Sequence, residues 1–251
     1  MSDRSTPIIE LQQVSLAASI GSAYLLQDVS FKVDRGDKLA IIGATGSGKT
    51  TLLRLLNRLS TPTTGEIYLE ETSLSQIPII QLRQQIVLVP QEPKLLGMSV
   101  VETLAYPLTL QKLPLKEIRQ RVETWRNALQ IPQEWLERNE LQLSLGQRQL
   151  ISITRALIMQ PRVLLLDEPT SALDVGIANH LLKVLNQLTE GSHTTIIMVN
   201  HQLELMQNFA QRILYLETGR VQEDVTANQS NWQRLQAKLL QKKVQEAEEW
   251  L

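Results

Sequence analysis

The 251-residue sequence contains no cysteine, which excludes disulfide bonds and thiolate chemistry. A chain without cysteine fits a reducing compartment, although engineered removal of cysteines would leave the same composition. Charge of one sign is not in excess either, because 25 Lys and Arg residues face 26 Asp and Glu residues and leave a formal net charge of −1. The sequence therefore has no global basic field of the kind that drives nucleic-acid binding, and we expect no nucleic-acid partner.

Long hydrophobic runs are also missing. The longest, such as Val163–Leu166, have the length of a strand and not of a membrane span. Residues 1–7 lack the apolar core of a signal peptide. We therefore expect a cytoplasmic chain, and any membrane role must come through a partner. The length allows one large α/β domain or two small ones, and one domain with an inserted subdomain is the preferred interpretation.

The most informative segment that is present reads GATGSGKT and follows the apolar run 39–42. It leads into the helical pattern 51–56, so the order strand, glycine loop, helix identifies a phosphate-binding P-loop rather than a chance match. Glycines let successive backbone N–H groups face phosphate oxygens, and the helix N-terminus adds partial positive charge. We expect Lys49 to reach the β- and γ-phosphates and the Thr50 hydroxyl to bind Mg²⁺. The predicted phosphate-binding residues are Gly43, Ala44, Thr45, Gly46, Ser47, Gly48, Lys49, Thr50 and Thr51.

The N-terminal part of the chain has the pattern of a β-rich region. Apolar and polar residues alternate over 8–14 and 24–33, which predicts half-buried antiparallel strands before the P-loop strand. Residues 61–65 end the first helix, and 66–69 begin another strand. The sequence thus predicts an antiparallel β-subdomain at this end.

The rest of the chain alternates helices and buried strands. From about 100 to 160 the periodicity is helical, with Pro107, Pro114 and Pro132 as punctuation, which indicates a helical subdomain. Strand-like runs at 162–166 and 194–199 enclose the helical stretch 174–188. This order predicts a βαβ crossover and a parallel sheet. Residues 213–223 are expected to form a closing hairpin.

Two carboxylates end one of the buried strands. Asp167 and Glu168 follow the run 163–166, and ligands of a parallel α/β sheet bind outside the carboxyl ends of its strands. Asp167 would bind Mg²⁺, directly or through water. Glu168 would orient and deprotonate a water molecule. The pair could instead simply end a strand before Pro169, but the P-loop elsewhere in the chain argues for a shared site.

At this point the residues resemble the ATP-binding-cassette (ABC) ATPases, over about residues 8–225. Leu143–Gln147, read LSLGQ, looks like the LSGGQ signature of that family, and Ser171–Asp174 looks like its D-loop. Ser144 and Gly146 come at the start of the expected helix 147–159, where a hydroxyl, N–H groups and the helix dipole can face an anion. A serine that merely caps a helix would look similar. Leu145 replaces the first signature glycine, and its side chain could restrict how closely the backbone approaches a phosphate.

The resemblance implies three further site residues. Gln91 looks like the Q-loop glutamine that contacts Mg²⁺ or the attacking water, and His201 looks like the switch histidine at the γ-phosphate, with Asn200 where many members have Thr. Tyr24 looks like the aromatic residue that stacks on adenine. Each has an ordinary alternative: a solvated loop glutamine, a helix-capping histidine and a packed strand tyrosine.

The resemblance also implies a mechanism and partners. Two chains would pack head to tail, so that Lys49 of one and Ser144, Gly146 and Gln147 of the other enclose one ATP, with Asp174 near the interface. We expect a homodimer with two hydrolysing sites that needs ATP and Mg²⁺ and drives a separate integral membrane permease. The permease would dock beside Gln91.

Other protein classes carry the same cassette. A regulatory ATPase that signals through a partner would look identical, and only transport assays would separate it. An ABC protein acting on ribosomes or DNA would usually show two cassettes, a coiled-coil insertion or a basic stripe. A P-loop kinase has no use for the signature and D-loop segments.

The expected fold class is thus α/β, a P-loop NTPase core of ABC type with an N-terminal antiparallel β-subdomain and an inserted helical subdomain. We expect an ATPase domain over residues 1–225, with the helical subdomain at about 92–160, and a tail over 226–251. The tail has the spacing of an amphipathic helix, with apolar residues at Trp232, Leu235, Leu239, Val244, Ala247 and Leu251. Docking on its own domain is its expected role.

Overall fold

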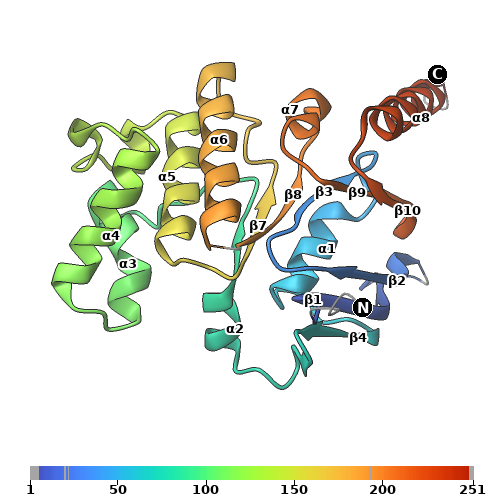
Figure 1. Cartoon of the computed structure of the whole chain (residues 1–251), viewed down its shortest axis with the longest axis horizontal. Helices are drawn as coiled ribbons and strands as arrows, with labels where there is room; N and C mark the ends of the chain where they lie inside the picture. Colours follow the sequence, from blue (N-terminus) through green and yellow to red (C-terminus); the bar gives the residue numbers. More distant parts are fainter. Residues whose placement is uncertain (1–5, 20, 22, 193, 249–251) are drawn as a thin grey trace.

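Two β-sheets form the frame of the protein, whose computed structural model describes residues 6–19, 21, 23–192 and 194–248. The smaller sheet is antiparallel and has the strand order β2-β1-β4-β5. Its strands are β1 (Ile9–Ala17), β2 (Tyr24–Val33), β4 (Thr64–Leu69) and β5 (Thr72–Ser73). This sheet confirms the expected N-terminal β-subdomain and lies at the lower right of Figure 1.

The larger sheet has the order β10-β9-β3-β8-β7-β6. Strands β9, β3, β8, β7 and β6 run parallel, and β10 is antiparallel to β9 as the predicted closing hairpin. The strands are β3 (Lys38–Ile42), β6 (Ile86–Val89), β7 (Val163–Asp167), β8 (Thr195–Val199), β9 (Arg212–Glu217) and β10 (Arg220–Thr226). The P-loop and the Asp167–Glu168 pair follow the carboxyl ends of β3 and β7, so the sheet brings both to one edge.

Helices cover both faces of this sheet and extend it at one end. The α-helices are α1 (Lys49–Leu56), α2 (Ile79–Gln85), α3 (Val100–Leu110), α4 (Leu115–Ala128), α5 (Leu145–Ile158), α6 (Val175–Ser192), α7 (Leu203–Gln207) and α8 (Gln229–Glu248). Two 3₁₀ turns, η1 (Gln133–Trp135) and η2 (Glu140–Gln142), precede α5. Helices α3, α4 and α5 gather at the left end of the molecule in Figure 1, as the expected helical subdomain.

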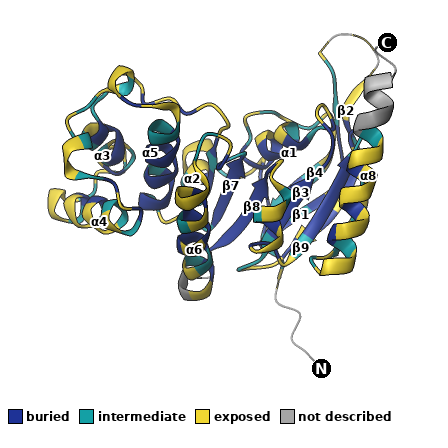
Figure 2. Ribbon diagram, turned by 90° about the horizontal axis from the view of Figure 1, so that it is seen from above, coloured by how far each residue is buried: buried dark blue, intermediate teal, exposed yellow. Residues whose placement is uncertain are grey.

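The core is divided by the larger sheet. Along β3, Ala40 and Ile42 pack into one apolar cluster with α5, α6 and α8, whereas Leu39 and Ile41 pack into another with α1 and the antiparallel sheet. Alternate side chains of a strand point to opposite faces, so a strand buried on both sides is apolar throughout. Figure 2 shows these central strands as the most buried part of the fold.

Two of the differences from the predicted helices have a clear physical reason. Pro107 lies inside α3 and does not end it, because Leu104 and Leu108 are fully buried and their packing outweighs one lost backbone hydrogen bond. Helix α5 begins at Leu145, two residues earlier than expected, because Ser144 and Gln147 form a reciprocal capping box. Pro114 and Pro132 do precede helical turns, as predicted.

The tail forms helix α8, which docks on its own domain as expected. Trp232, Leu235 and Leu239 are buried in the core cluster on the α8 side of the larger sheet. The side chains of Val244 and Ala247, and the whole of Leu251, lie outside the described residues. Burial of one face of α8 against the sheet fixes the helix beside β9 and β10.

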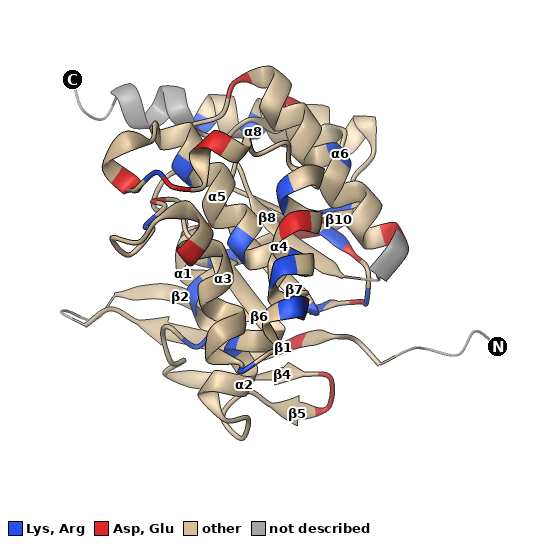
Figure 3. Ribbon diagram, turned by 90° about the vertical axis from the view of Figure 1, so that its left-hand side faces the viewer, with Lys and Arg blue, Asp and Glu red and all other residues tan. Residues whose placement is uncertain are grey.

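The surface carries both signs of charge. In Figure 3, which looks onto the end formed by α3, α4 and α5, Lys and Arg residues are interspersed with Asp and Glu residues. None of the helices in the described ranges has the length and apolar character needed to cross a bilayer.

Candidate nucleotide site

The P-loop joins the end of β3 to the start of α1, and two glycines make its path possible. A Cβ on Gly43 would lie 2.2 Å from the carbonyl oxygen of Leu216, and a Cβ on Gly48 would lie 2.9 Å from that of Leu25. Gly48 also has a φ of 99° as the N-cap of α1, a left-handed conformation that favours glycine. The unpaired N–H groups of the first turn of α1 therefore open onto the loop, where an anion would bind. The remaining predicted phosphate-binding residues, Ala44, Thr45, Gly46, Ser47, Thr50 and Thr51, lie in the same loop and turn.

Lys49 is folded back onto the loop. Its Nζ donates to the carbonyl oxygens of Gly43 at 2.9 Å and Ala44 at 2.7 Å, and only 6% of the residue is exposed. Burial lowers the pKa of the Lys49 ammonium, and the nearby Glu168 and Asp167 carboxylates oppose that shift. Neutral carbonyl groups of the loop thus hold the Lys49 ammonium, and the oxygens of an anionic phosphate can replace them.

Asp167 ends β7 and is 3% exposed. Burial raises the pKa of its carboxyl group, and interaction with the Thr50 hydroxyl opposes the rise. Its Oδ1 atom is buried and has no hydrogen-bond partner, which leaves a hard oxygen free to bind a cation. In the described chain no three His, Cys, Asp or Glu side chains gather to hold a metal by themselves. Asp167 and Thr50 therefore fit a Mg²⁺ ion that takes its other ligands from water and nucleotide.

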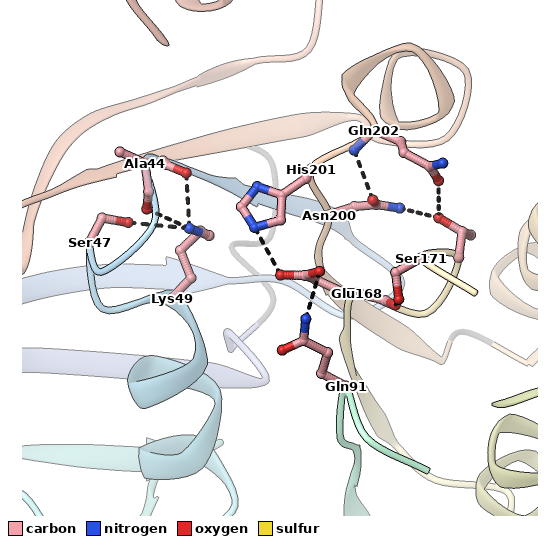
Figure 4. Close-up of polar contacts among 11 residues, drawn as sticks. Ala44, Ser47, Lys49, Gln91, Glu168, Ser171, Asn200, His201 and Gln202 are labelled. Carbon is pink, nitrogen blue, oxygen red and sulfur yellow. Dashed lines mark hydrogen bonds and ion pairs between the residues drawn. The ribbon is translucent and has the colours of Figure 1, made fainter. Parts of the chain in front are cut away.

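Glu168 is held from two sides (Figure 4). Its Oε2 accepts a hydrogen bond from Nε2 of Gln91 at 2.9 Å, and its Oε1 lies 2.8 Å from Nε2 of His201. The backbone has a left-handed φ of 51°, and its N–H donates to the carbonyl oxygen of Val199 at 2.8 Å. The structure therefore brings together the three residues that are predicted to be catalytic, from the segments that follow β6, β7 and β8.

A polar network supports the segment that carries His201, and sequence reasoning gave it no role. The Nδ2 atom of buried Asn200 donates to Thr170 Oγ1 at 2.7 Å, and Thr170 Oγ1 donates to Gln202 Oε1 at 2.6 Å. Asn200 Oδ1 accepts the backbone N–H of Gln202 at 2.9 Å. These bonds join the turn after β8 to the turn after β7. Asn200 and Gln202, on either side of His201, therefore fix its position relative to Glu168.

The signature segment sits at the N-terminus of α5. Ser144 Oγ accepts the N–H of Gln147 at 3.2 Å, and Gln147 Oε1 accepts the N–H of Ser144 at 2.9 Å. A Cβ on Gly146 would lie 2.5 Å from the carbonyl oxygen of Ala172. Leu145 is 49% exposed. A side chain at position 146 would therefore clash with the D-loop of the same chain, and glycine avoids this clash. The side chain of Leu145, which replaces the first signature glycine, is half exposed and meets no comparable clash within the described chain.

Several other predicted site residues make no hydrogen bond to the P-loop within the described ranges. Asp174 caps α6 by accepting the N–H of Ile177 at 2.9 Å, and no hydrogen bond joins Ser144 to the P-loop in the described part of the chain. Helices α5 and α1 lie on different sides of β7 and α6 in both Figures 1 and 2. Tyr24 begins β2 and is 48% exposed, and the residues of this strand that lie against Gly48 of the P-loop are Leu25 and Leu26.

Comparison with known proteins shows the family of the chain. A sequence model described as ABC transporter matches residues 26–171, which is more than half of the chain and spans the P-loop, the signature and the two carboxylates. The chain belongs to the ABC transporter family. The expected α/β fold of ABC type is thereby confirmed.

Curated members of this family match most of the chain. The spermidine/putrescine import ATP-binding protein PotA of Legionella pneumophila (strain Lens) is 36% identical over 224 residues, which cover 87% of this chain and 59% of PotA. The methionine import ATP-binding protein MetN 2 of Bacillus cereus (strain ATCC 10987 / NRS 248) is 35% identical over 223 residues, which cover 86% of this chain and 66% of MetN 2. The matched region thus spans about three fifths to two thirds of these relatives.

Solved ABC cassettes share the fold. A dimeric post-hydrolysis state of the ATP-binding cassette MJ0796 bound to ADP and Pi superposes with a TM-score of 0.82 at 27% identity, covering 88% of this chain and 99% of that one. The cbiO1 protein from Clostridium perfringens, part of the ABC transporter complex cbiONQ, gives a TM-score of 0.80 at 27% identity, covering 96% and 95%.

Proposed function

We propose that this ABC-family chain is an ATPase that binds MgATP between two copies of itself and drives a separate membrane permease. The proposal rests on the position of Glu168. It follows β7 beside the P-loop, accepts a hydrogen bond from Gln91 and contacts His201. A carboxylate held between an amide and an imidazole at a phosphate-binding loop is suited to activate water for attack on a phosphoryl group.

The residues of one chain perform most of the chemistry in this proposal. Lys49 exchanges the carbonyl oxygens of the P-loop for phosphate oxygens. Glu168 accepts a proton from the attacking water, while Gln91 fixes one of its oxygens. His201 lies at the other oxygen and would donate to the γ-phosphate. Mg²⁺, held by Thr50 and Asp167, supplies charge neutralisation for the phosphates when bound.

The second copy completes the site. Ser144, Gly146 and Gln147 lie at a helix N-terminus, which attracts anions, yet α5 lies away from the P-loop of its own chain. A head-to-tail homodimer would bring this tip to the nucleotide of the partner and place Asp174 near the interface. The dimeric structure of the similar MJ0796 cassette supports this arrangement. ATP would favour the closed dimer, and hydrolysis would open it.

A membrane partner would dock in an apolar groove between the core and the helical subdomain. This groove has a volume of about 230 Å³ and lies between β6, α3 and α5, with Leu96, Tyr106 and Leu110 among its lining residues. Leu96 is 59% and Leu110 is 64% exposed, which leaves apolar surface for a permease helix. The chain would then be peripheral on the cytoplasmic face of the membrane. The importer relatives PotA and MetN 2 favour this role over a regulatory ATPase.

The substitution Glu168→Gln tests the ATPase proposal. It keeps size and shape but removes the proton acceptor, so we expect turnover to fall by about 10²–10⁴-fold while MgATP binding persists and the protein elutes as a nucleotide-bound dimer. Lys49→Ala should abolish nucleotide binding.

Glu71→Gln serves as the matched control, because Glu71 is an exposed carboxylate in the turn between β4 and β5. It should retain wild-type turnover in a phosphate-release assay. Near wild-type hydrolysis by Glu168→Gln would remove Glu168 from the proposed role.

A further inference from the structure

Helix α8 is tied by charged side chains to the hairpin formed by β9 and β10. The Nζ atom of Lys242 lies 2.6 Å from Oε1 of Glu217, with side-chain exposures of 24% and 33%. Arg234 lies 2.5 Å from Glu223, and Lys238 also pairs with Glu223. The hydrogen bond from Arg234 is the main reason that the pKa of the Glu223 carboxyl group falls to about 2. Both strands of the hairpin are therefore held by the same helix.

The turn of this hairpin is hydrogen-bonded to the P-loop. The N–H of Gly219 donates to the carbonyl oxygen of Ser47 at 3.1 Å, and the N–H of Gln27 donates to the carbonyl oxygen of Gly219 at 2.8 Å. At the end of β9, the carbonyl oxygen of Leu216 lies so close to Gly43 that a Cβ there would be 2.2 Å away. The two ends of the phosphate loop thus rest on residues 216–219.

The turn leaves little freedom between Glu217 and the P-loop. Thr218 and Gly219 have φ values of 44° and 74°, which is the two-residue hairpin geometry that matches strand twist. Glu217 is adjacent to this turn, and its carboxylate also accepts a hydrogen bond from the Tyr215 hydroxyl at 3.4 Å. A displacement of Glu217 is therefore passed to Gly219 and to Ser47 through one short, stiff segment.

We propose that Glu217 is a positioning residue for nucleotide binding, through which Lys242 of α8 holds the β9–β10 turn against the P-loop. The C-terminal helix then influences the affinity of the phosphate loop through this ion pair. This inference rests on the proposed ATPase function and extends it to a segment outside the P-loop, signature and carboxylate motifs. Because the ion pair is partly exposed, its effect is modest and is screened by salt.

The test measures binding of a fluorescent ATP analogue with Mg²⁺ to the full chain. Glu217→Gln keeps the size and an acceptor but removes the charge, and Lys242→Met removes the partner charge. Each should weaken binding by about two- to five-fold at low salt, and the double variant should be no weaker than either single one. In steady-state hydrolysis, KM should rise while kcat is unchanged. The charge exchange Glu217→Lys with Lys242→Glu should restore affinity.

The matched control is Glu123→Gln, which removes the 2.7 Å ion pair between Glu123 and Arg126 on α4. We expect no change in nucleotide affinity from this variant, and we expect the loss in Glu217→Gln to vanish in about 0.5 M salt. Unchanged affinity in Glu217→Gln, an equal loss in Glu123→Gln, or additive losses in the double variant would overturn the inference. Lys49→Ala separates the two proposals, because retained nucleotide binding in that variant would overturn the ATPase proposal itself.

Discussion

A methyl group at position 146 tests how the signature helix is joined to the D-loop. In Gly146→Ala, the new Cβ would lie 2.5 Å from the carbonyl oxygen of Ala172. Real contacts of this kind are not shorter than 3.0 Å, so the first turn of α5 or the D-loop backbone must move by about half an ångström or more. The contact joins a helix Cβ to a backbone oxygen, and neither can turn aside as the end of a long side chain could. The displacement is therefore passed along the backbone to Ser144 in α5 or to Asp174 in the D-loop.

The size of the effect follows from two opposing contributions. Overpacking of this kind costs about 1–3 kcal/mol, and replacing glycine by alanine in a helix returns about 1 kcal/mol. The free energy of unfolding should therefore fall by about 0–2 kcal/mol. Turnover should suffer more, because a misplacement approaching 1 Å in a catalytic arrangement costs up to about 10²-fold. We expect MgATP hydrolysis to decrease by about 10- to 100-fold.

The second residue of α6 provides a matched control for Gly146. Gly176 occupies the same position in its helix as Gly146 does in α5, but its added Cβ would meet only the Asp174 side chain, at 3.3 Å. Gly176→Ala should therefore be as stable as the wild type or more stable. Thermal unfolding and phosphate release would be measured on both variants. Wild-type turnover in Gly146→Ala, together with stability equal to that of Gly176→Ala, would refute the reasoning.

Two further predictions concern the metal and the membrane partner. Burial raises the pKa of Asp167, and Mg²⁺ binds the ionised carboxylate, so Mg²⁺ affinity should be full above the raised pKa and weaken by about tenfold per pH unit below it. Calorimetric titration should show this pH dependence. The same pH dependence in Asp167→Asn would contradict the assignment of Asp167 as a ligand. Leu110→Asp, in the apolar groove, should reduce co-purification with the permease while the ATPase rate of the free subunit stays constant. The control Leu115→Asp, at a residue that is 71% exposed, should change neither. Equal co-purification of both variants would contradict the docking site.

Much of the candidate nucleotide site could be predicted because its parts are local in sequence. The spacing of Gly43 to Thr50 between a strand and a helix specifies a P-loop, and Asp167 and Glu168 at the end of an apolar run specify a strand end beside it. Helix α5 begins two residues before the helical periodicity predicts, since the capping role of Ser144 depends on a bond to Gln147 that the periodicity does not show.

The sequence alone determined the parts of the candidate nucleotide site: a glycine-rich loop between a strand and a helix, a pair of carboxylates at a strand end and a serine at a helix start, each encoded by a few consecutive residues. Only the tertiary structure decided that Gln91 and His201 both bind Glu168, that Gly146 rests on Ala172, and that α8 holds the turn behind the P-loop. The physical reason is that each of these contacts joins segments far apart along the chain. Such contacts depend on how the sheet and helices pack, which no local pattern records.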